Sequence, residues 1–197
     1  MTGADGIPPG TRPPGATAWD GEAYQQRFDA LAAEGVDVHG EVDCLMTFAP
    51  HSVLDAGCGT GRVAAELSSR GVAAVGIDRD PSMISTARRL APGVRFEVLD
   101  VATADLGETF DVVVMAGNVP LFTPEGTQPA LVTGCARHLH TGGRLVTGFQ
   151  LGRGYALEDY DAACTAAGLV PEVRWSTWER DEFVVGAGYA VSVHRAP

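Results

Sequence analysis

Short apolar runs alternate with amphipathic segments through most of the 197-residue chain. Five runs of strand length cover residues 52–56, 73–77, 94–99, 110–116 and 143–149. Four segments with apolar residues at helical spacing follow them, over about 60–69, 82–90, 124–139 and 158–167. Strands that alternate with helices predict a mainly parallel sheet with helices on both faces.

The end of the chain shows a different pattern. Residues 170–179 and 182–195 alternate in hydrophobicity with period two, and the short acidic turn Arg180-Asp181 separates them. Such a pair predicts an antiparallel hairpin. The expected fold class is therefore α/β, with a doubly wound, mostly parallel sheet of seven strands and a C-terminal antiparallel hairpin.

The beginning of the chain divides into two parts. Residues 1–18 are rich in Pro and Gly with almost no large apolar side chains, which predicts a disordered tail. Apolar side chains at helical spacing then predict a helix that ends at Gly35, and a second helix over about 38–48. We expect residues 19–197 to form one domain, in which 19–50 make a helical cap.

Composition and charge exclude several classes of protein. The net charge of −11 disfavours nucleic-acid binding, which draws affinity from Lys and Arg on phosphates. No apolar run approaches the ~20 residues of a membrane span, and no basic segment followed by an apolar run marks a secretory signal. The four cysteines form no cluster with histidine, so we expect reduced thiols, no metal, and a cytoplasmic protein without membrane contact.

A glycine turn follows the first predicted strand directly, in the stretch VLDAGCGTG at residues 53–61. In an open parallel sheet, ligands bind beyond the carboxyl ends of the strands. Polar residues collect at those ends in this chain, namely Asp55, Asp78, Asp100, Asn118 and Gln150. The sequence therefore predicts a ligand site at this edge of the sheet.

Three kinds of ligand compete for this turn. A dinucleotide requires G-x-G-x-x-G, whereas Gly57, Gly59 and Gly61 are spaced one residue too tightly, and Asp55 would repel a pyrophosphate. The triphosphate motif G-x-x-x-x-G-K-[ST] has no match. An adenosyl ligand without phosphate suits the acids, because a carboxylate after the second strand can accept both ribose hydroxyls, and a positive sulfonium is favoured by nearby negative charge.

Five segments in order resemble the motifs of the class I S-adenosylmethionine-dependent methyltransferases: VLDAGCGTG, GIDRDPSMI, LDVATADL, FDVVVMAGNVPLF and HLHTGGRLVTGF. The resemblance runs from about Tyr24 to the C-terminus. It is nearest to small bacterial enzymes of the ubiquinone/menaquinone and trans-aconitate type, with a domain like methyltransferase domains 11 and 25. It implies a Rossmann-like fold, S-adenosyl-L-methionine as cofactor and S-adenosyl-L-homocysteine as product.

The same resemblance implies which residues contact the cofactor. The methionine portion would lie against Asp55, Ala56, Gly57, Cys58, Gly59 and Gly61, with Tyr24 closing over it. The ribose and adenine would lie against Asp78, Arg79, Met83, Asp100 and Val101. The sulfonium would lie near Ala116 and Asn118.

The methyl acceptor is expected to be a small molecule. Enzymes that modify adenine or glutamine carry an Asn/Asp-Pro-Pro-aromatic turn, and here Val119 and Leu121 depart from it, which argues against a planar base. Methyl transfer is an in-line displacement in which positioning supplies much of the catalysis, and Asn118 is the candidate positioning residue. No catalytic base is assigned. Candidate acceptor contacts are Trp19, Phe28, Phe122, Gln150 and Tyr155.

Two other functions stay open at this point. A non-catalytic module that binds S-adenosylmethionine would carry the same motifs. An NAD(P)-dependent oxidoreductase is disfavoured by the glycine spacing and by the lack of a Tyr-x-x-x-Lys pair. The sequence is compatible with a monomer or a homodimer.

Overall fold

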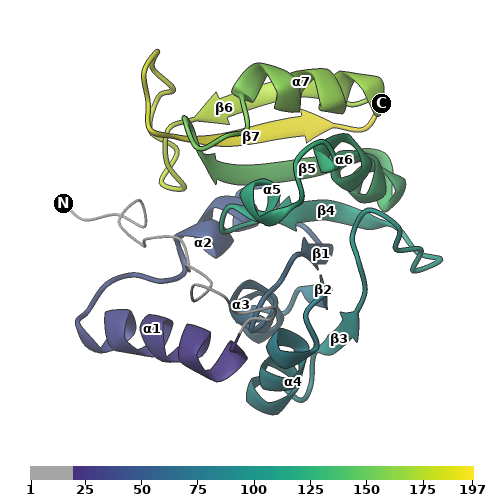
Figure 1. Ribbon diagram of the computed structural model, residues 1–197. Coiled ribbons are helices and arrows are strands. Elements are labelled where there is room, and N and C mark those ends of the chain that lie inside the picture. The colour runs from purple at the N-terminus through teal and green to yellow at the C-terminus, as the bar shows by residue number, and fades with distance from the viewer. Residues whose placement is uncertain (1–19) are drawn as a thin grey trace.

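The computed structural model describes residues 20–197 (Figure 1). The predicted N-terminal tail and Trp19 lie outside the described residues.

A seven-stranded sheet forms the centre of the molecule, with the strand order β3-β2-β1-β4-β5-β7-β6. The strands are β1 (Ser52–Ala56), β2 (Ala73–Asp78), β3 (Arg95–Val98), β4 (Phe110–Met115), β5 (Leu139–Gln150), β6 (Val170–Trp175) and β7 (Tyr189–Arg195). Strands β1 to β5 pair in parallel, whereas β7 is antiparallel to both β5 and β6. The predicted α/β class and strand number are confirmed.

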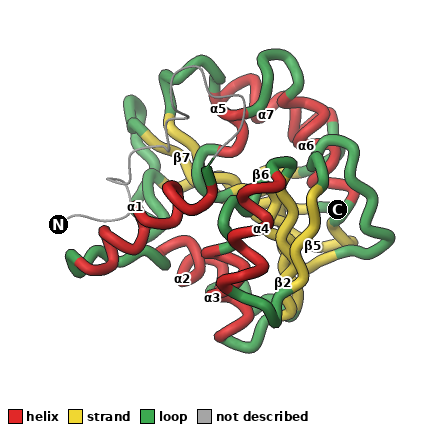
Figure 2. The backbone as a smooth tube through the Cα atoms, turned by 60° about the horizontal axis from the view of Figure 1, so that its bottom comes forward, coloured by secondary structure: helices red, strands yellow, loops and turns green. Residues whose placement is uncertain are grey.

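Helices cover both faces of this sheet (Figure 2). They are α1 (Gly21–Ala33), α2 (Gly40–Met46), α3 (Arg62–Ser69), α4 (Pro81–Leu90), α5 (Val119–Phe122), α6 (Gln128–Arg137) and α7 (Leu157–Ala166). Successive residues of β4 point to opposite cores, because Val113 packs with the buried side chains of α6 and α7 and Val114 with those of α2 and α3. A central strand that is buried on both sides explains the continuous apolar run at residues 112–115 of β4.

One predicted helix is shorter than the pattern indicated. The segment 124–139 was predicted as helix throughout, but α6 covers only Gln128–Arg137. Pro124 begins a turn in which Gly126 has a φ of 82°, and Thr127 donates its amide to the Pro124 carbonyl. At the other end Leu139 already pairs with Phe110 of β4, so β5 begins four residues before the predicted position.

The predicted C-terminal hairpin is correct in pairing and wrong in extent. Strand β7 begins at Tyr189, and residues 176–188 form a loop that includes a short turn closed by the Ser176 amide on the Asp181 carbonyl. Gly186, with a φ of 89°, interrupts the extended backbone that the apolar pattern predicted. The loop brings Trp178 to the same end of the sheet as the glycine turn.

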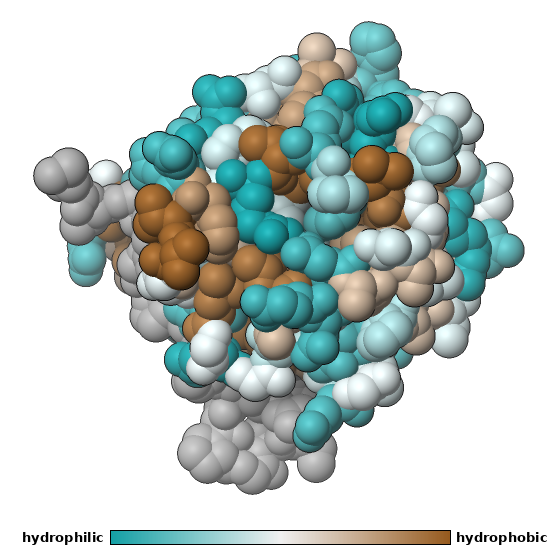
Figure 3. All heavy atoms as spheres, turned by 90° about the horizontal axis from the view of Figure 1, so that it is seen from above, coloured by the Kyte–Doolittle hydropathy of each residue, from teal (hydrophilic) through white to brown (hydrophobic). Residues whose placement is uncertain are grey.

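The surface is mixed in character. On the face seen from above, hydrophilic atoms surround scattered apolar groups (Figure 3). Exposed apolar side chains of the C-terminal region include Val170, Val173, Val184 and Val185. Among the described helices none has the length and apolar character that a bilayer crossing requires. Residues 20–197 contain no cluster of three or more His, Cys, Asp or Glu side chains that could hold a metal.

Candidate functional site

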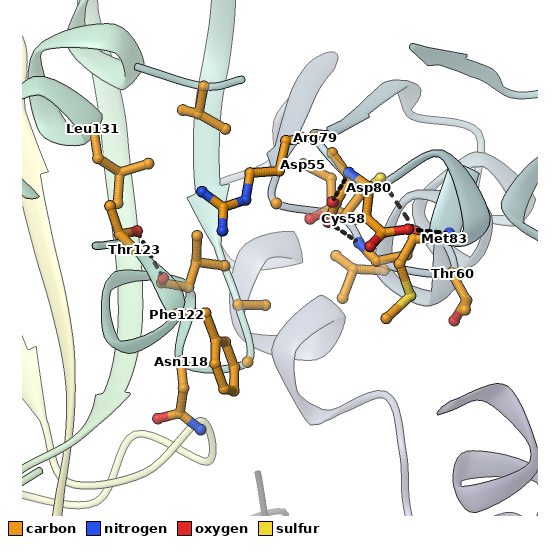
Figure 4. A pocket seen from close by; sticks show the side chains of 18 of the residues that line it. Asp55, Cys58, Thr60, Arg79, Asp80, Met83, Asn118, Phe122, Thr123 and Leu131 are labelled. Carbon is orange, nitrogen blue, oxygen red and sulfur yellow. Dashed lines mark hydrogen bonds between the residues drawn. The ribbon is translucent and has the colours of Figure 1, made fainter. Parts of the chain in front are cut away.

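A cavity of about 370 Å³ lies at the carboxyl ends of the central strands (Figure 4). The glycine turn and the β2–α4 turn form one side of it, and the α5–α6 segment forms the facing side. Helix α1 and the β6–β7 loop contribute further walls. This is the sheet edge at which the sequence predicted a ligand site.

The glycine turn that begins the site is held against β2. The amides of Gly57 and Cys58 both donate to the Ile77 carbonyl, at 2.8 and 3.0 Å. Gly57 and Gly61 have φ values of 80° and 79°, which side-chain-bearing residues rarely adopt. A Cβ at Gly57 would lie 2.8 Å from Val119, so the glycine also allows α5 to approach the turn.

Asp55 connects this turn to helix α3. Its side chain is buried, and Oδ2 accepts a hydrogen bond from the Ala64 amide at 3.2 Å. Burial raises the pKa of Asp55 to about 7, and the positive charge of Arg62 opposes part of that rise. Asp55 lines the cavity. With a pKa of about 7, its carboxyl group is partly protonated at neutral pH.

Asp78, at the end of β2, binds the backbone on two sides. Oδ2 accepts from the Gly59 amide at 3.0 Å, and Oδ1 accepts from the Asp80 amide at 2.9 Å. Burial raises its pKa, and these two amide hydrogen bonds act in the opposite direction. A carboxylate has about four acceptor positions. Asp78 can therefore fix the glycine turn and still accept two hydroxyl groups.

Asp80 is the N-cap residue of α4. Its Oδ1 accepts from the amides of Ser82 and Met83 at 2.9 and 3.4 Å, which caps the N-terminus of α4. The cap leaves Asp78 available to the cavity.

The far end of the cavity is formed by the loop after β3. Asp100 is exposed, and its Oδ1 accepts from the Ala102 amide at 2.9 Å, so it stabilises a turn as well as lining the cavity beside Val101. The Arg79 side chain extends from the β2–α4 turn into the space in front of Thr123 and Leu131 (Figure 4).

Helix α1 covers the glycine turn. The Tyr24 and Phe28 rings lie 5.3 Å apart, and the Arg62 guanidinium lies 4.7 Å from the centre of the Phe28 ring. Glu41 holds Arg62 through two hydrogen bonds of 2.5 and 2.9 Å. Gln25 on the same helix accepts a hydrogen bond from the Thr60 hydroxyl at 2.7 Å. These contacts place two aromatic rings of α1 at the cavity.

The ends of β4 and β5 are joined by Asn118. Its backbone is left-handed, with φ of 68°, and its amide donates to the Gly148 carbonyl at 3.2 Å. Oδ1 of the side chain accepts from the Gln150 amide at 2.7 Å. Beside them Trp178 donates its indole N–H to the Tyr189 hydroxyl at 3.2 Å.

Most of the predicted site residues reach the cavity. Those that line it are Tyr24, Phe28, Asp55, Gly57, Cys58, Gly59, Asp78, Arg79, Met83, Asp100, Val101, Ala116, Asn118, Phe122 and Gln150.

Three predicted residues do not line it. Ala56 is fully buried in the sheet. Gly61 is the N-cap residue of α3, and a Cβ there would lie 2.5 Å from the Phe96 ring. Tyr155 packs in the core, 5.8 Å from the Phe149 ring, so its predicted contact with the acceptor is not supported by its position. Ala56 and Gly61 therefore support the glycine turn without lining the cavity.

Several lining residues were not predicted from the sequence, among them Arg27, Glu41, Thr60, Arg62, Trp178 and Tyr189. Arg27 could have been found, because it lies three residues after Tyr24 on the same face of a predicted helix. The pairing of Glu41 with Arg62 joins two helices and leaves no signal in the sequence. Trp178 is buried in the core cluster that contains residues of α2 and α3, and the β6–β7 loop also brings it to the cavity.

Comparison with known proteins identifies the family. A family model described as a methyltransferase domain matches residues 53–143. The chain is 31% identical over 189 residues to a trans-aconitate 2-methyltransferase of Methylobacterium nodulans, covering 90% of this chain and 71% of that protein. The chain belongs to the class I S-adenosylmethionine-dependent methyltransferases. This membership replaces the dinucleotide interpretation, and the cofactor is S-adenosylmethionine.

Solved structures agree with this methyltransferase fold. A TehB-like S-adenosylmethionine-dependent methyltransferase from Corynebacterium glutamicum is 36% identical, with a TM-score of 0.85 over 90% of this chain and 98% of that one. The magnesium protoporphyrin IX methyltransferase of Synechocystis, solved with bound S-adenosylmethionine, has a TM-score of 0.62 at 18% identity over 90% of this chain and 79% of that one. The second similarity concerns the fold alone.

Proposed function

We propose that this methyltransferase transfers the methyl group of S-adenosylmethionine to a small-molecule acceptor by in-line displacement. The observation that carries the proposal is the position of Asp78, which binds the Gly59 amide and faces a cavity of about 370 Å³. Small-ligand pockets span about 300–1,000 Å³, so the cavity suits the cofactor and a compact acceptor.

The residues present fit the chemistry of this cofactor. Asp78 offers acceptor positions to the two ribose hydroxyls, and the glycine turn exposes backbone to the amino-acid portion. Arg79, Met83, Asp100 and Val101 surround the adenine in this proposal. The full proposed contact set is Tyr24, Asp55, Gly57, Cys58, Gly59, Asp78, Arg79, Met83, Asp100, Val101, Ala116 and Asn118, with Ala56 and Gly61 supporting the turn.

The protein's part in the reaction is positioning. The bound cofactor supplies an electrophilic methyl group on a positively charged sulfur. Asn118 is held rigidly between the Gly148 carbonyl and the Gln150 amide, and in this proposal it orients the acceptor. Phe28, Phe122 and Gln150 form the proposed acceptor wall. Because the leaving group is already activated, holding the acceptor at attack distance supplies much of the rate.

Isothermal titration calorimetry with S-adenosylmethionine and S-adenosylhomocysteine tests the proposal. We expect both to bind, together with transfer of labelled methyl to a small-molecule panel. No binding at millimolar concentration would overturn the proposed site. Tight binding without turnover on any acceptor would favour the non-catalytic module instead.

A further inference from the structure

The loop between β3 and β4 supplies part of the cavity wall. It covers residues 99–109, beyond a strand at the edge of the sheet, and its residues 100–102 line the cavity. Local hydrogen bonds form a turn in it, in which the Asp100 carbonyl accepts from the Ala104 amide at 2.8 Å. Such local bonds set the shape of the turn but not its position relative to the cavity. That position depends on contacts with another element.

The last turn of helix α6 makes these contacts. Arg137 donates to the Ala104 carbonyl at 2.8 Å, and the Leu106 amide donates to Nε2 of His138, the C-cap residue, at 3.1 Å. Because Nε2 accepts, Nδ1 carries the ring proton and donates to the Gly134 carbonyl at 2.8 Å. Within residues 20–197, the bonds of Arg137 and His138 are those that join residues 100–107 to another element.

Gly134 brings α6 directly against the backbone of the loop. Gly134 is buried, and a Cβ there would overlap the Val101 carbonyl oxygen and lie 2.9 Å from the carbonyl carbon. Ala130 and Leu131 line the cavity, and they lie on the same helix face because they are four and three residues before Gly134. One face of α6 therefore meets both the cavity and the loop that lines it.

The loop presents a carboxylate to the cavity. Asp100 is exposed, and its Oδ1 accepts from the Ala102 amide at 2.9 Å. A carboxylate has about four acceptor positions, so Asp100 can also accept from an amino group of a ligand. A carbonyl oxygen at the same place would offer no hydrogen to it. Hydrogen bonds weaken steeply when their geometry is lost, so this discrimination depends on where the loop lies.

We propose that Gly134 and Arg137 of α6 are positioning residues that set the base selectivity of the cofactor site. They hold the β3–β4 loop where Asp100 accepts a hydrogen bond from the exocyclic amino group of adenine. The inference rests on the proposed function, in which Asp100 and Val101 surround the adenine. Neither Gly134 nor Arg137 lines the cavity, so each acts through the loop.

Two matched ligands test this role: S-adenosyl-L-homocysteine and S-inosyl-L-homocysteine, in which a carbonyl replaces the amino group of the base. Each is titrated into the protein by calorimetry. We expect the wild type to prefer the adenosyl ligand about tenfold, the value of one ordinary hydrogen bond. Gly134→Ala should reduce that preference towards equal affinity, chiefly by weakening the adenosyl ligand. Helix propensity alone would predict a more stable α6, because Ala is a better helix former than Gly.

Arg137→Met gives a second test with little risk to folding, because Arg137 is exposed. It removes the bond to the Ala104 carbonyl and should lower the preference about threefold, whereas Arg137→Lys keeps a donor and should retain most of it. Hydrogen exchange of the Leu106 amide in the ligand-free protein should become faster in Arg137→Met, a readout that is independent of the cofactor.

Controls separate positioning from stability. Arg70→Met removes another exposed arginine at a helix end, which binds Asp43, and Thr133→Ala changes an exposed neighbour of Gly134 on α6. Neither residue contacts the loop by a hydrogen bond, and both variants should keep the wild-type preference.

A Gly134→Ala or Arg137→Met variant that keeps the wild-type preference would remove its residue from the proposal, even if both ligands bind more weakly. Equal affinity of the wild type for the two ligands would overturn the inference altogether. Failure of the wild type to bind either ligand would instead overturn the proposed function, so the two failures are distinguishable.

Discussion

Two carboxylates that share the cavity differ because their partners differ. Asp55 is almost fully buried and accepts one amide hydrogen bond, so desolvation governs it and its pKa rises to about 7. Desolvation raises the pKa of Asp78 as well, but Asp78 accepts two amide hydrogen bonds, which oppose that rise. Asp78 is therefore the better partner for ligand hydroxyls, and Asp55 is the group whose pKa reaches about 7.

The raised pKa of Asp55 predicts a dependence of stability on pH. The group ionises near 3.8 in the unfolded chain and near 7 in the folded protein. The titration of Asp55 leaves the free energy of unfolding unchanged below pH 3.8. It lowers that free energy as pH rises from 3.8 to about 7, and the loss is complete above pH 7. Asp55→Asn keeps an acceptor for Ala64 and removes this loss.

The unfolding free energy of Asp55→Asn minus that of the wild type should therefore increase from pH 5 to pH 8, as measured by urea denaturation. A difference that stays constant over that range would show that Asp55 is not the titrating group.

Asp78 predicts an effect on cofactor affinity. Asp78→Ala should weaken S-adenosylmethionine binding by roughly 1–3 kcal/mol, because it leaves buried hydroxyl groups unpaired. Calorimetry measures the change. Asp105→Ala is the control, since Asp105 also accepts from an amide two residues on but lies outside the cavity. Equal affinity in the wild type and Asp78→Ala would remove Asp78 from the proposed site.

The lining of the proposed cofactor half of the cavity was predicted from the sequence better than that of the proposed acceptor half. Asp55 and Asp78 lie at the carboxyl ends of β1 and β2, and Gly57 directly follows β1, so their place is set by the strand–turn–helix pattern. Trp178 reaches the cavity through a loop of thirteen residues, 176–188, whose path depends on how β7 inserts beside β5. Tyr155 also follows β5 closely, yet it turns into the core against Phe149.

At the scale of elements, α1 is attached mainly by polar contacts. Only Gly21 and Phe28 of this helix are buried. The Gly21 amide donates to the Ser82 hydroxyl at 2.9 Å, and Glu22 binds Arg89 at 2.6 Å. Exposed ion pairs contribute little to stability. Helix α1 should therefore open more readily than the sheet, which is what a cover over a binding site requires.

Gly21→Ala tests this attachment. A Cβ there would lie 2.7 Å from both the Ser82 carbonyl and the Thr86 hydroxyl, so α1 must move away from α4. Hydrogen exchange should become faster in residues 21–33 and stay unchanged in the sheet. The affinity for S-adenosylhomocysteine should fall, because Tyr24 and Phe28 line the cavity.

Intrinsic helix propensity alone would give the opposite sign, since Ala is better than Gly in a helix by about 0.5–1 kcal/mol. Gly93→Ala, which has open space around its Cβ, is the control. Slower exchange in α1 of the Gly21→Ala variant would contradict the packing argument.

The elements that the pattern predicted well are those with a single, strong period. Strands β1 and β4 are mostly apolar, and their bounds match the prediction within one residue. The errors fall where glycine and proline compete with hydrophobicity. Gly186 turns an apolar stretch into a loop, and Pro124 with Gly126 delays the start of α6. Hydrophobic periodicity does not predict such backbone effects, because they depend on single glycine and proline residues.

At the scale of the whole molecule, the sheet joins both halves of the site. Strand β1 pairs with β2 on one side and with β4 on the other. It therefore lies between the proposed cofactor wall at the end of β2 and the proposed acceptor wall at the end of β4. One buried cluster contains Ile77 of β2 together with Tyr160 of α7. Since no gap in packing separates the two halves, we expect residues 20–197 to unfold as one unit.

Differential scanning calorimetry tests both the single unfolding unit and the proposed cofactor site. The protein should show one unfolding transition, and S-adenosylhomocysteine at 100 times its Kd should stabilise it by about 2.7 kcal/mol. For a chain of this length each kcal/mol raises Tm by about 2–4 °C, so the expected rise is about 5–10 °C. The Asp78→Ala variant should show a smaller rise at the same ligand concentration, because its affinity is lower. Two separate transitions would contradict the continuous core, and an unchanged Tm with ligand would contradict a cofactor site inside it.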